Sequence, residues 1–264
     1  MSTLAGGGFF VASMGPPLTN RALILRTRAY GESDRIVSFL SEDYGKLTGI
    51  AKGARNSRRR FVNCLNPFTL VRVHFRQRRA ATMVFMDSCD LLSLPGPLSD
   101  PLKFAYASYL VELVDLLTVE GQPVAELFDL LGSALEGLRQ GPATAGFLRS
   151  FELRLLGDVG FAPRLGNCNA CQRELVAGEE AFFDRQDGAL ACVRCGASRD
   201  GLLPVSAAAL ATLSQLVELS PEEARQLRLA APVRAETATL VGHWLALHLP
   251  RPLKSVGLIA AFAG

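Results

Sequence analysis

The sequence predicts an α+β protein of several domains: a small N-terminal β-barrel, a helical body, and a four-cysteine module inserted into that body. Three observations carry this prediction. Apolar residues alternate with period two in the first part of the chain, helical periodicity begins after Pro97, and two C-x2-C pairs lie between helical stretches. With 49% hydrophobic residues the chain can build real cores, and no apolar run is long enough to cross a bilayer.

The barrel is predicted from five short stretches with strand character. They cover residues 21–28, 36–40, 46–52, 69–76 and 81–86. The acidic turn Glu42-Asp43-Tyr44-Gly45 separates the second stretch from the third, and the fourth alternates cleanly between apolar and polar residues. Five short strands so closely spaced favour the five-stranded oligonucleotide-binding (OB) barrel, which places basic strands and loops around a groove.

Beyond Pro97 the sequence has the period of helices. Ser99-Asp100-Pro101 and Ser220-Pro221-Glu222-Glu223 are typical helix starts, with a capping residue followed by proline. Helices are predicted over residues 102–119, about 123–138, 143–159, 206–219, 220–229 and 233–249. The predicted domains are a leader over residues 1–20, the barrel over 21–93, the helical body over 94–165 and 205–264, and the cysteine module over 166–204.

The leader carries no Lys, Arg, Asp or Glu, and it contains Gly6-Gly7-Gly8 and Pro16-Pro17. A secretory signal needs a basic region before its apolar stretch, and that region is missing here. We therefore expect residues 1–20 to be a flexible leader and the protein to be cytoplasmic, where paired cysteines stay reduced.

Four cysteines form the most specific motif of the chain. Cys168 and Cys171 make one C-x2-C pair, and Cys192 and Cys195 make a second pair after 20 intervening residues. Each pair brings two thiolates to one side of a metal, so the two pairs together complete a tetrahedron. The all-sulfur set favours one structural Zn²⁺ per chain, with iron as the less favoured occupant, because four protein ligands leave no position for water. Two disulfides, or paired thiols without metal, are the alternatives.

The charge is distributed unevenly along the chain. Residues 1–80 hold 14 Lys and Arg against four Asp and Glu, a net +10, whereas the remaining residues hold 14 basic against 21 acidic groups, a net −7. A basic end on a mildly acidic body is typical of a protein that binds a polyanion, and nucleic acid is the favoured one.

Basic residues are densest between Lys52 and Phe61, where Gly53, Asn56 and Ser57 indicate a loop. Arginine forks pair with phosphate oxygens, so this loop is the first candidate DNA-binding site, although a solvated surface loop would have the same composition. Phe61 is predicted to anchor the loop to the barrel rather than to stack on a base. The first set of candidates is Lys52, Arg55, Arg58, Arg59 and Arg60. The second set is Arg26, Arg35, Arg72, Arg76, Arg78 and Arg79.

Groups typical of catalysis are sparse, and we predict that the protein is not an enzyme. His74 lies within a strand pattern, while His243 and His248 are five residues apart on the last predicted helix, which does not suit a shared metal. The sequence contains neither a phosphate-binding Gly-Lys-Ser/Thr loop nor a nucleophile elbow. Cys64 and Cys89 are predicted to be buried as small hydrophobic residues.

Together these residues resemble the bacterial RecO recombination mediators. The resemblance is carried by the stretches Tyr30–Val37, Gly45-Lys46-Leu47, Ala51–Arg55, Phe151–Pro163 and Pro252–Ser255, in this order around the cysteine quartet. It extends from about Arg21 to the C-terminus and leaves the leader outside.

The resemblance implies a function that the spacing alone does not give. RecO-like proteins have an OB barrel, a helical domain and a zinc module. They bind single- and double-stranded DNA and anneal complementary strands. With RecR they act on DNA coated by the single-stranded-DNA-binding protein (SSB), so that recombinase loads there, which implies association with the nucleoid during repair. They use no nucleotide cofactor, and their zinc ligands correspond here to Cys168, Cys171, Cys192 and Cys195.

Two other classes of function remain open from the residues. One is a zinc-ribbon regulator that recognises a specific duplex sequence. The other is an interaction scaffold whose basic face binds an acidic protein. For the acidic C-terminal tail of SSB, which ends in apolar residues, we expect an apolar pocket in the helical body, rimmed by arginines such as Arg139, Arg149 or Arg154. Arg194 and Arg199, beside the second cysteine pair, either extend the DNA track or are ordinary solvated charges.

Overall fold

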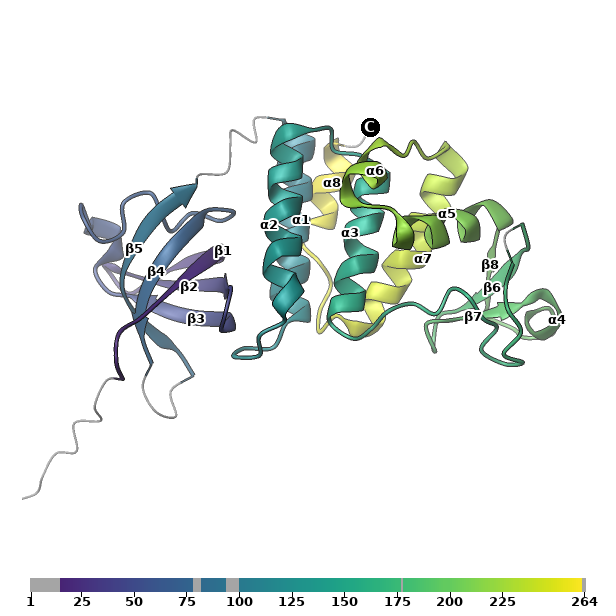
Figure 1. The fold of residues 1–264 in the computed structure, drawn as a ribbon, viewed down its shortest axis with the longest axis horizontal. Helices are drawn as coiled ribbons and strands as arrows, with labels where there is room; N and C mark the ends of the chain where they lie inside the picture. Colours follow the sequence, from purple (N-terminus) through teal and green to yellow (C-terminus); the bar gives the residue numbers. More distant parts are fainter. Residues whose placement is uncertain (1–14, 78–81, 94–99, 177, 263–264) are drawn as a thin grey trace, which may run out of the picture. The chain divides into compact units, whose positions relative to one another are not determined.

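The computed structural model describes residues 15–77, 82–93, 100–176 and 178–262. The chain divides into two compact units, Met1–Leu94 and Pro95–Gly264 (Figure 1). The first contains the predicted barrel, and the second contains both the helices and the cysteine module. Among the described residues, none of the helices has the length and the apolar composition that a membrane span requires.

The first unit is a closed five-stranded barrel, which confirms the predicted architecture. Its strands, in the order β1-β2-β3-β5-β4, are β1 (Leu18–Tyr30), β2 (Asp34–Ser41), β3 (Gly45–Ala51), β4 (Leu70–Arg76) and β5 (Val84–Ser93). Neighbouring strands are antiparallel, except that β3 and β5 run parallel, with Gly49 opposite Val84. The long β1 pairs with both β2 and β4 and so closes the barrel.

Apolar side chains at every second position of the strands fill the barrel interior. Val37 and Phe39 on β2 and Val73 and Phe75 on β4 are fully buried, while the residues between them face outward on β4. Phe75 is packed edge-on against Phe39, with ring centroids 6.3 Å apart. The side chains of the five strands thus form one core, because a period of two directs every second residue inward.

Two of the differences from the predicted strand boundaries bear on the closure of the barrel. β1 begins at Leu18, inside the predicted leader, because the start of this strand pairs with β4 from Leu18 opposite Phe75 to Leu23 opposite Leu70. β5 continues to Ser93 instead of ending at Met86, since its second half completes the ladder with β4. Residues 1–14 of the predicted leader lie outside the described part of the chain.

The second unit is built on helices that the sequence largely predicted. Three precede the cysteine module: α1 (Pro101–Leu117), α2 (Ala125–Gln140) and α3 (Ala145–Asp158). Four follow it: α5 (Ala207–Glu218), α6 (Pro221–Gln226), α7 (Ala231–His248) and α8 (Val256–Phe262), of which α8 was not predicted. The predicted helix starts are confirmed, since Asp100 caps α1 and Ser220 forms a capping box with Glu223 on α6.

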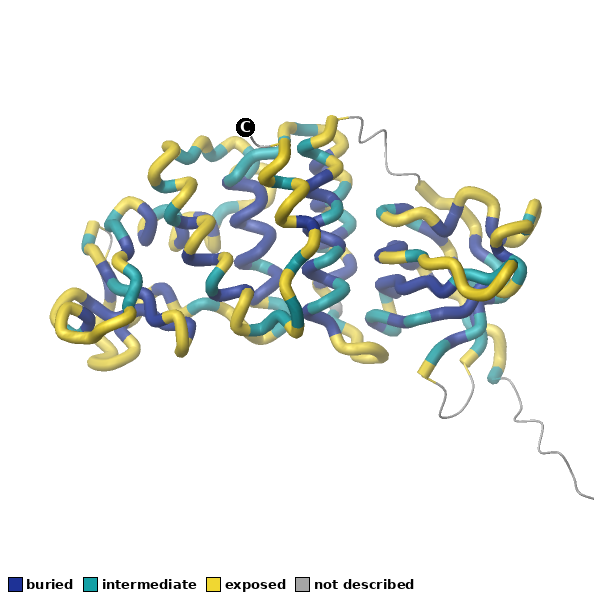
Figure 2. The backbone as a smooth tube through the Cα atoms, turned by 180° about the vertical axis from the view of Figure 1, so that it is seen from behind, coloured by how far each residue is buried: buried dark blue, intermediate teal, exposed yellow. Residues whose placement is uncertain are grey.

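The most continuously buried helices of this unit are α1 and α3. Figure 2 shows long buried stretches within the helices of this unit. Leu110, Leu113, Leu155 and Leu156 are all fully buried. The cysteine module emerges between α3 and α5 and adds a three-stranded sheet in the order β7-β6-β8, formed by β6 (Ala181–Asp184), β7 (Ala189–Cys192) and β8 (Leu203–Val205). Its short helix is α4 (Val193–Gly196).

Candidate nucleic-acid interface and metal centre

The basic loop of the barrel, residues 52–61, is fixed at its base by Asp34. The carboxylate Oδ1 of Asp34 accepts a hydrogen bond from the backbone N–H of Gly53 at 2.8 Å, and this bond lowers the pKa of Asp34. Gly53 has φ 66°, a left-handed conformation in which glycine carries no Cβ penalty. The loop therefore leaves β3 in a defined direction.

Two of the candidate arginines are used to shape the loop. Arg55 donates through Nη1 to the carbonyl of Glu32 at 3.0 Å, and its backbone N–H donates to the carbonyl of Ser33. Arg60 donates through Nη2 to the carbonyl of Lys52 at 2.8 Å, which ties the end of the loop to its start. Both are among the predicted phosphate-binding residues, whereas these contacts show that both stabilise the conformation of the loop.

Arg58 and Arg59 remain as the outward-facing pair of the loop. Both are exposed, and no side chain or carbonyl among the described residues forms a hydrogen bond or ion pair with either guanidinium. Phe61 is only 5% exposed and belongs to the barrel core, which confirms that it anchors the loop. Lys52 is exposed, with its ammonium 5.8 Å from the ring centroid of Phe85.

A second basic site lies on the outer face of β1, β2 and β3. Arg26 and Arg28, two residues apart on β1, line a cavity of about 110 Å³ together with Ile36, Ser38 and Thr48. The strand register explains the grouping, since Arg26 is opposite Ser38 and Ser38 is opposite Thr48. Arg28 and the two hydroxyl residues were not among the predicted site residues, although the spacing of Arg26 and Arg28 already placed both on one face.

The other predicted arginines lie in different surroundings. Arg35 is half-buried opposite Ala51, at the end of β3 where the basic loop begins. On β4, Arg76 forms an ion pair with Asp87 at 2.9 Å, and Arg72 lies opposite Asp90. Acidic residues of β5 thus balance the charge of β4. Arg78 and Arg79 lie outside the described residues.

The four cysteines of the module converge on one point. All four sulfur atoms lie within 4.8 Å of one another, and the sulfurs of Cys171 and Cys192 are 3.9 Å apart. Zn–S bonds of about 2.3 Å in a tetrahedron place the sulfurs about 3.8 Å apart, so the cluster has the size that a metal ion needs. All four are free thiols, and they belong to two different segments as the spacing predicted.

Backbone hydrogen bonds hold the first pair in place. The N–H of Cys168 donates to the carbonyl of Arg173, and the N–H of Gln172 returns a bond to the carbonyl of Cys168, each at 2.8 Å. The N–H of Asn169 donates to the carbonyl of Leu190 on β7. The hairpin β6–β7 then delivers Cys192 at its end, opposite Ala181. The two pairs are therefore connected through the sheet even before a metal binds.

The peptide groups around the cluster favour thiolates. Burial alone would raise the pKa of the Cys168 thiol, but backbone N–H groups of Cys171, Cys192 and Ala170 outweigh it and lower this pKa to about 6. The backbone N–H of Cys195 lowers the pKa of Cys192. Because a metal ion binds thiolates and not thiols, these hydrogen bonds favour metal binding at Cys168 and Cys192, whereas the sulfurs of Cys192 and Cys171 raise the pKa of Cys195 to about 12.

The module packs on α7 through aromatic contacts. Phe183 of β6 and Trp244 of α7 have ring centroids 5.4 Å apart, and a Cβ at Gly188 would lie 3.2 Å from the indole nitrogen of Trp244. Arg199 forms an ion pair with Asp184 at 2.5 Å, whereas Arg194 is exposed. Arg199 is thus engaged within the module.

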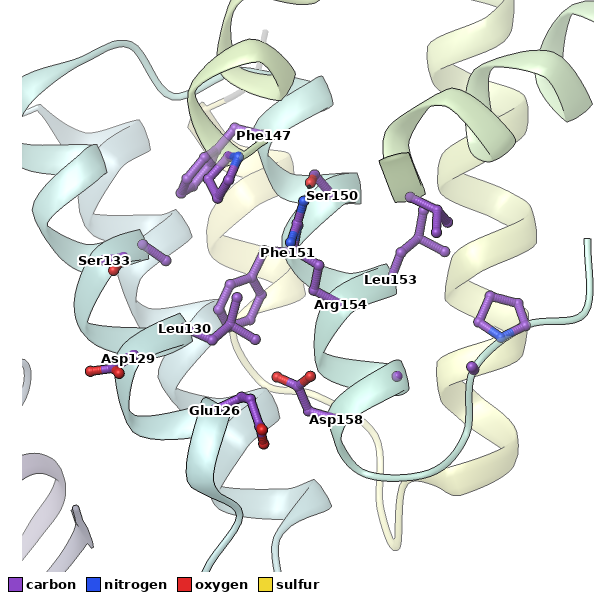
Figure 3. Close-up of a pocket in the computed structure, with 16 residues that line it drawn as sticks. Glu126, Asp129, Leu130, Ser133, Phe147, Ser150, Phe151, Leu153, Arg154 and Asp158 are labelled. Carbon is purple, nitrogen blue, oxygen red and sulfur yellow. Dashed lines mark hydrogen bonds between the residues drawn. The ribbon is translucent and has the colours of Figure 1, made fainter. Parts of the chain in front are cut away.

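The helical unit contains an apolar pocket of about 490 Å³ between α2 and α3, closed on one side by residues from α5 and α6 (Figure 3). Of the three arginines expected at its rim, only Arg154 lines it. Arg149 is 7% exposed because it forms a buried ion pair with Glu152, and Arg139 is bound to Glu136 on the surface of α2. Arg149 and Arg139 therefore do not line this pocket.

Two of the three histidines make structural contacts. His74 lies between Thr19 and Asp90, with its two ring nitrogens each 2.9 Å from an oxygen of these residues. His248 stacks on Phe161 with ring centroids 4.0 Å apart. Cys64 and Cys89 are buried in the barrel core, as predicted.

Comparison with known proteins agrees with these two units. Residues 14–95 match the family model "Recombination protein O N terminal", and residues 98–256 match "Recombination protein O C terminal". The chain is 38% identical over 240 residues to the DNA repair protein RecO of Myxococcus xanthus, a match that covers 90% of this chain and 95% of that protein. It is 35% identical over 244 residues to RecO of Geobacter metallireducens, a match that covers 90% of this chain and 95% of that protein. It is 33% identical over 239 residues to RecO of Syntrophus aciditrophicus, and here the match covers 89% of this chain and 92% of that protein. Barrel, helical unit and cysteine module are thus all matched along nearly the whole chain, which belongs to the RecO family of DNA repair proteins.

Proposed function

We propose that the protein is a non-enzymatic recombination mediator that binds single- and double-stranded DNA and anneals complementary strands. With RecR it would help recombinase to load on DNA coated by SSB. One observation carries the proposal: a closed OB-type barrel holds Arg58 and Arg59 outward on a loop whose ends are fastened by Asp34, Arg60 and the buried Phe61.

The basic loop supports DNA binding through the phosphate backbone. A guanidinium without a partner in the protein needs no ion pair to be broken before it meets a phosphate, and each contact releases condensed counterions. The cavity beside Arg26 and Arg28 brings two further arginines of the same barrel together. Such contacts recognise the backbone and not the bases, so binding should be independent of sequence.

Annealing follows from the same charges. Two complementary strands repel each other, and the repulsion falls when cationic side chains replace diffuse counterions between them. A protein that holds strands by the backbone leaves the base edges available for pairing. No covalent bond is made or broken in this account, which is why it requires no catalytic group.

We propose one structural Zn²⁺ as the cofactor, held by Cys168, Cys171, Cys192 and Cys195. The convergence of the four sulfurs and the hydrogen bonds to Cys168 support this assignment. When bound, zinc would cross-link the first cysteine pair to the β6–β7 hairpin. RecR and the SSB tail are proposed as protein partners because the resemblance to RecO mediators implies them.

The experiment that tests this function follows duplex formation between two labelled complementary strands coated with SSB, in the presence of RecR. We expect the wild-type chain to accelerate annealing and the double variant Arg58→Ala/Arg59→Ala to lose most of that acceleration. The double variant Arg228→Ala/Arg234→Ala is the matched control, since it removes the same charge from exposed positions of the helical unit that are not DNA-binding candidates. Strong preference for one duplex sequence would instead indicate a sequence-specific regulator. Acceleration that is equal in all three proteins would contradict the proposal.

A further inference from the structure

The pocket between α2 and α3 has apolar walls and an acidic rim. Leu130, Phe147, Phe151 and Val217 contribute to the walls, and Val217 is 45% exposed although it is apolar. Its volume of about 490 Å³ lies in the range of sites that enclose ligand groups and would hold the apolar side chains of a short peptide segment. Figure 3 shows side chains from both helices converging on this space.

Three carboxylates line the same pocket. Glu126 and Asp129 come from the first turns of α2, and Asp158 is the last residue of α3. Among the described residues, no side chain or backbone group forms a hydrogen bond or ion pair with any of these three carboxylates. Glu126 and Asp158 lie close together at one end of the pocket (Figure 3).

The one arginine in the pocket does not neutralise this rim. Arg154 donates through Nη2 to the carbonyl of Leu219 and through Nε to the hydroxyl of Ser150 at 3.4 Å, so its donors serve to join α3 to the end of α5. Partial burial raises the pKa of Asp158, the nearby Glu126 raises it further, and Arg154 only partly opposes them. Among the described residues, the negative charge at the rim of this pocket is thus only partly neutralised.

We infer that this pocket docks a segment of a partner protein in which an apolar anchor side chain is flanked by lysine or arginine. The apolar walls would take the anchor, and the carboxylates of Glu126, Asp129 and Asp158 would pair with the flanking cations. The sign of the charge argues against an acidic peptide and against nucleic acid at this place. The inference does not depend on DNA binding by the barrel.

The test uses the full, zinc-loaded chain and two short fluorescent peptides with the same apolar anchors, one flanked by lysines and the other by glutamates. In an anisotropy titration we expect the lysine peptide to bind at least about tenfold more tightly, with an advantage that shrinks as salt rises. The double variant Glu126→Gln/Asp158→Asn should remove most of that advantage and leave only the contribution of Asp129. It should fold normally, because the folded protein disfavours the charge on Asp158.

Two further variants make the result specific to the pocket. Glu180→Gln/Asp200→Asn removes two exposed acids elsewhere in the unit and should leave the advantage intact. Gly157→Gln should abolish binding of the lysine peptide, because Gly157 lines the pocket and a Cβ there meets no atom within 4 Å, so the longer side chain enters the cavity without a clash. Tighter binding of the glutamate peptide, or a lysine-peptide affinity unchanged by Glu126→Gln/Asp158→Asn, would overturn the inference. The inference would also be overturned if the chain self-associates and this association displaces the lysine peptide. The pocket would then be the binding site for a second copy of the chain.

Discussion

The carboxylate of Glu112 accepts hydrogen bonds from both the backbone N–H and the hydroxyl of Ser255, through Oε2 at 2.9 and 2.8 Å. Its other oxygen accepts from the backbone N–H of Lys254 and from the guanidinium of Arg251. The stretch Pro252–Ser255, part of the resemblance to RecO proteins, is therefore the point at which the C-terminal segment is fastened to α1. Ser255 is only 4% exposed, so its hydrogen bonds to Glu112 are largely shielded from water.

Replacing Glu112 by alanine should destabilise the helical unit by about 1–3 kcal/mol, because the buried N–H and hydroxyl of Ser255 would lose their acceptor. Chemical denaturation of the two proteins measures this difference. Glu218→Ala removes an exposed acid from α5 and serves as the control, with an expected change below about 0.5 kcal/mol.

The contribution of Glu112 should also depend on pH. Partial burial alone would raise its pKa, but the hydrogen bonds from Ser255, Lys254 and Arg251 outweigh it, so the folded-state pKa lies below the ordinary value of 4.5. The stabilisation is then complete above pH 4.5 and is lost as pH falls through the lower folded-state pKa. The stability difference between wild type and Glu112→Gln should therefore shrink below that pH. A difference that stays constant down to full protonation would show that the charge is irrelevant.

Arg149 should prove structural and not part of a docking rim. It pairs with the fully buried Glu152 at 2.7 Å, and Glu152 also accepts from the hydroxyl of Tyr109. Arg149→Ala would leave a buried carboxylate without its cation, at a cost of about 3–5 kcal/mol in unfolding free energy. Arg139→Ala, which breaks a pair on the exposed surface, should cost less than about 1 kcal/mol. Equal losses in both variants would contradict this division.

Asp34 should control the order of the basic loop. In Asp34→Ala the N–H of Gly53 loses its acceptor, so the exposed Arg58 and Arg59 should become easier targets for trypsin. We expect cleavage in the loop to become severalfold faster while the thermal transition of the barrel shifts little. Ser57→Ala, which removes only the bond between its hydroxyl and the N–H of Arg60, should have a smaller effect.

Metal removal should change the fluorescence of the single tryptophan of the chain. Trp244 is 5% exposed and packs against Phe183 of the cysteine module. A chelator should detach the module from α7, shift the tryptophan emission to longer wavelength and release one Zn²⁺ per chain. The helical circular dichroism should largely remain, because α1 and α3 have a core of their own. If the emission does not change on metal removal, the module is held without zinc.

The sequence predicted the features that are local in the chain. Apolar and β-branched stretches identified all five strands, capping residues located α1 and α6, and the C-x2-C pairs identified the four cysteines that converge in the module. The three-residue β8 and the short α8 lack a periodic signal of sufficient length, which explains why neither was predicted.

Features that depend on tertiary contacts could not be predicted in this way. The side chain of Arg60 is held against the loop by the carbonyl of Lys52, eight residues away in the sequence. The burial of Arg149 depends on the packing of α3 against α1, where Tyr109 donates a hydrogen bond to Glu152. Charge counting placed acids throughout the second unit but could not show that Glu126 and Asp158, on different helices, share one pocket. Such groupings are set by packing and not by spacing.

The most direct test of the central claim is the salt dependence of binding to a random single strand. Each phosphate neutralised contributes a slope of about −0.7 in a plot of log affinity against log salt. If Arg58 and Arg59 each contact a phosphate, the variant Arg58→Ala/Arg59→Ala should flatten the wild-type slope by about 1.4 units, with an unchanged thermal transition. Arg60 should be left in place, because it ties the loop to Lys52. An affinity and a slope identical to those of the wild type would show that the loop is only a solvated surface and that the barrel binds DNA elsewhere, if at all.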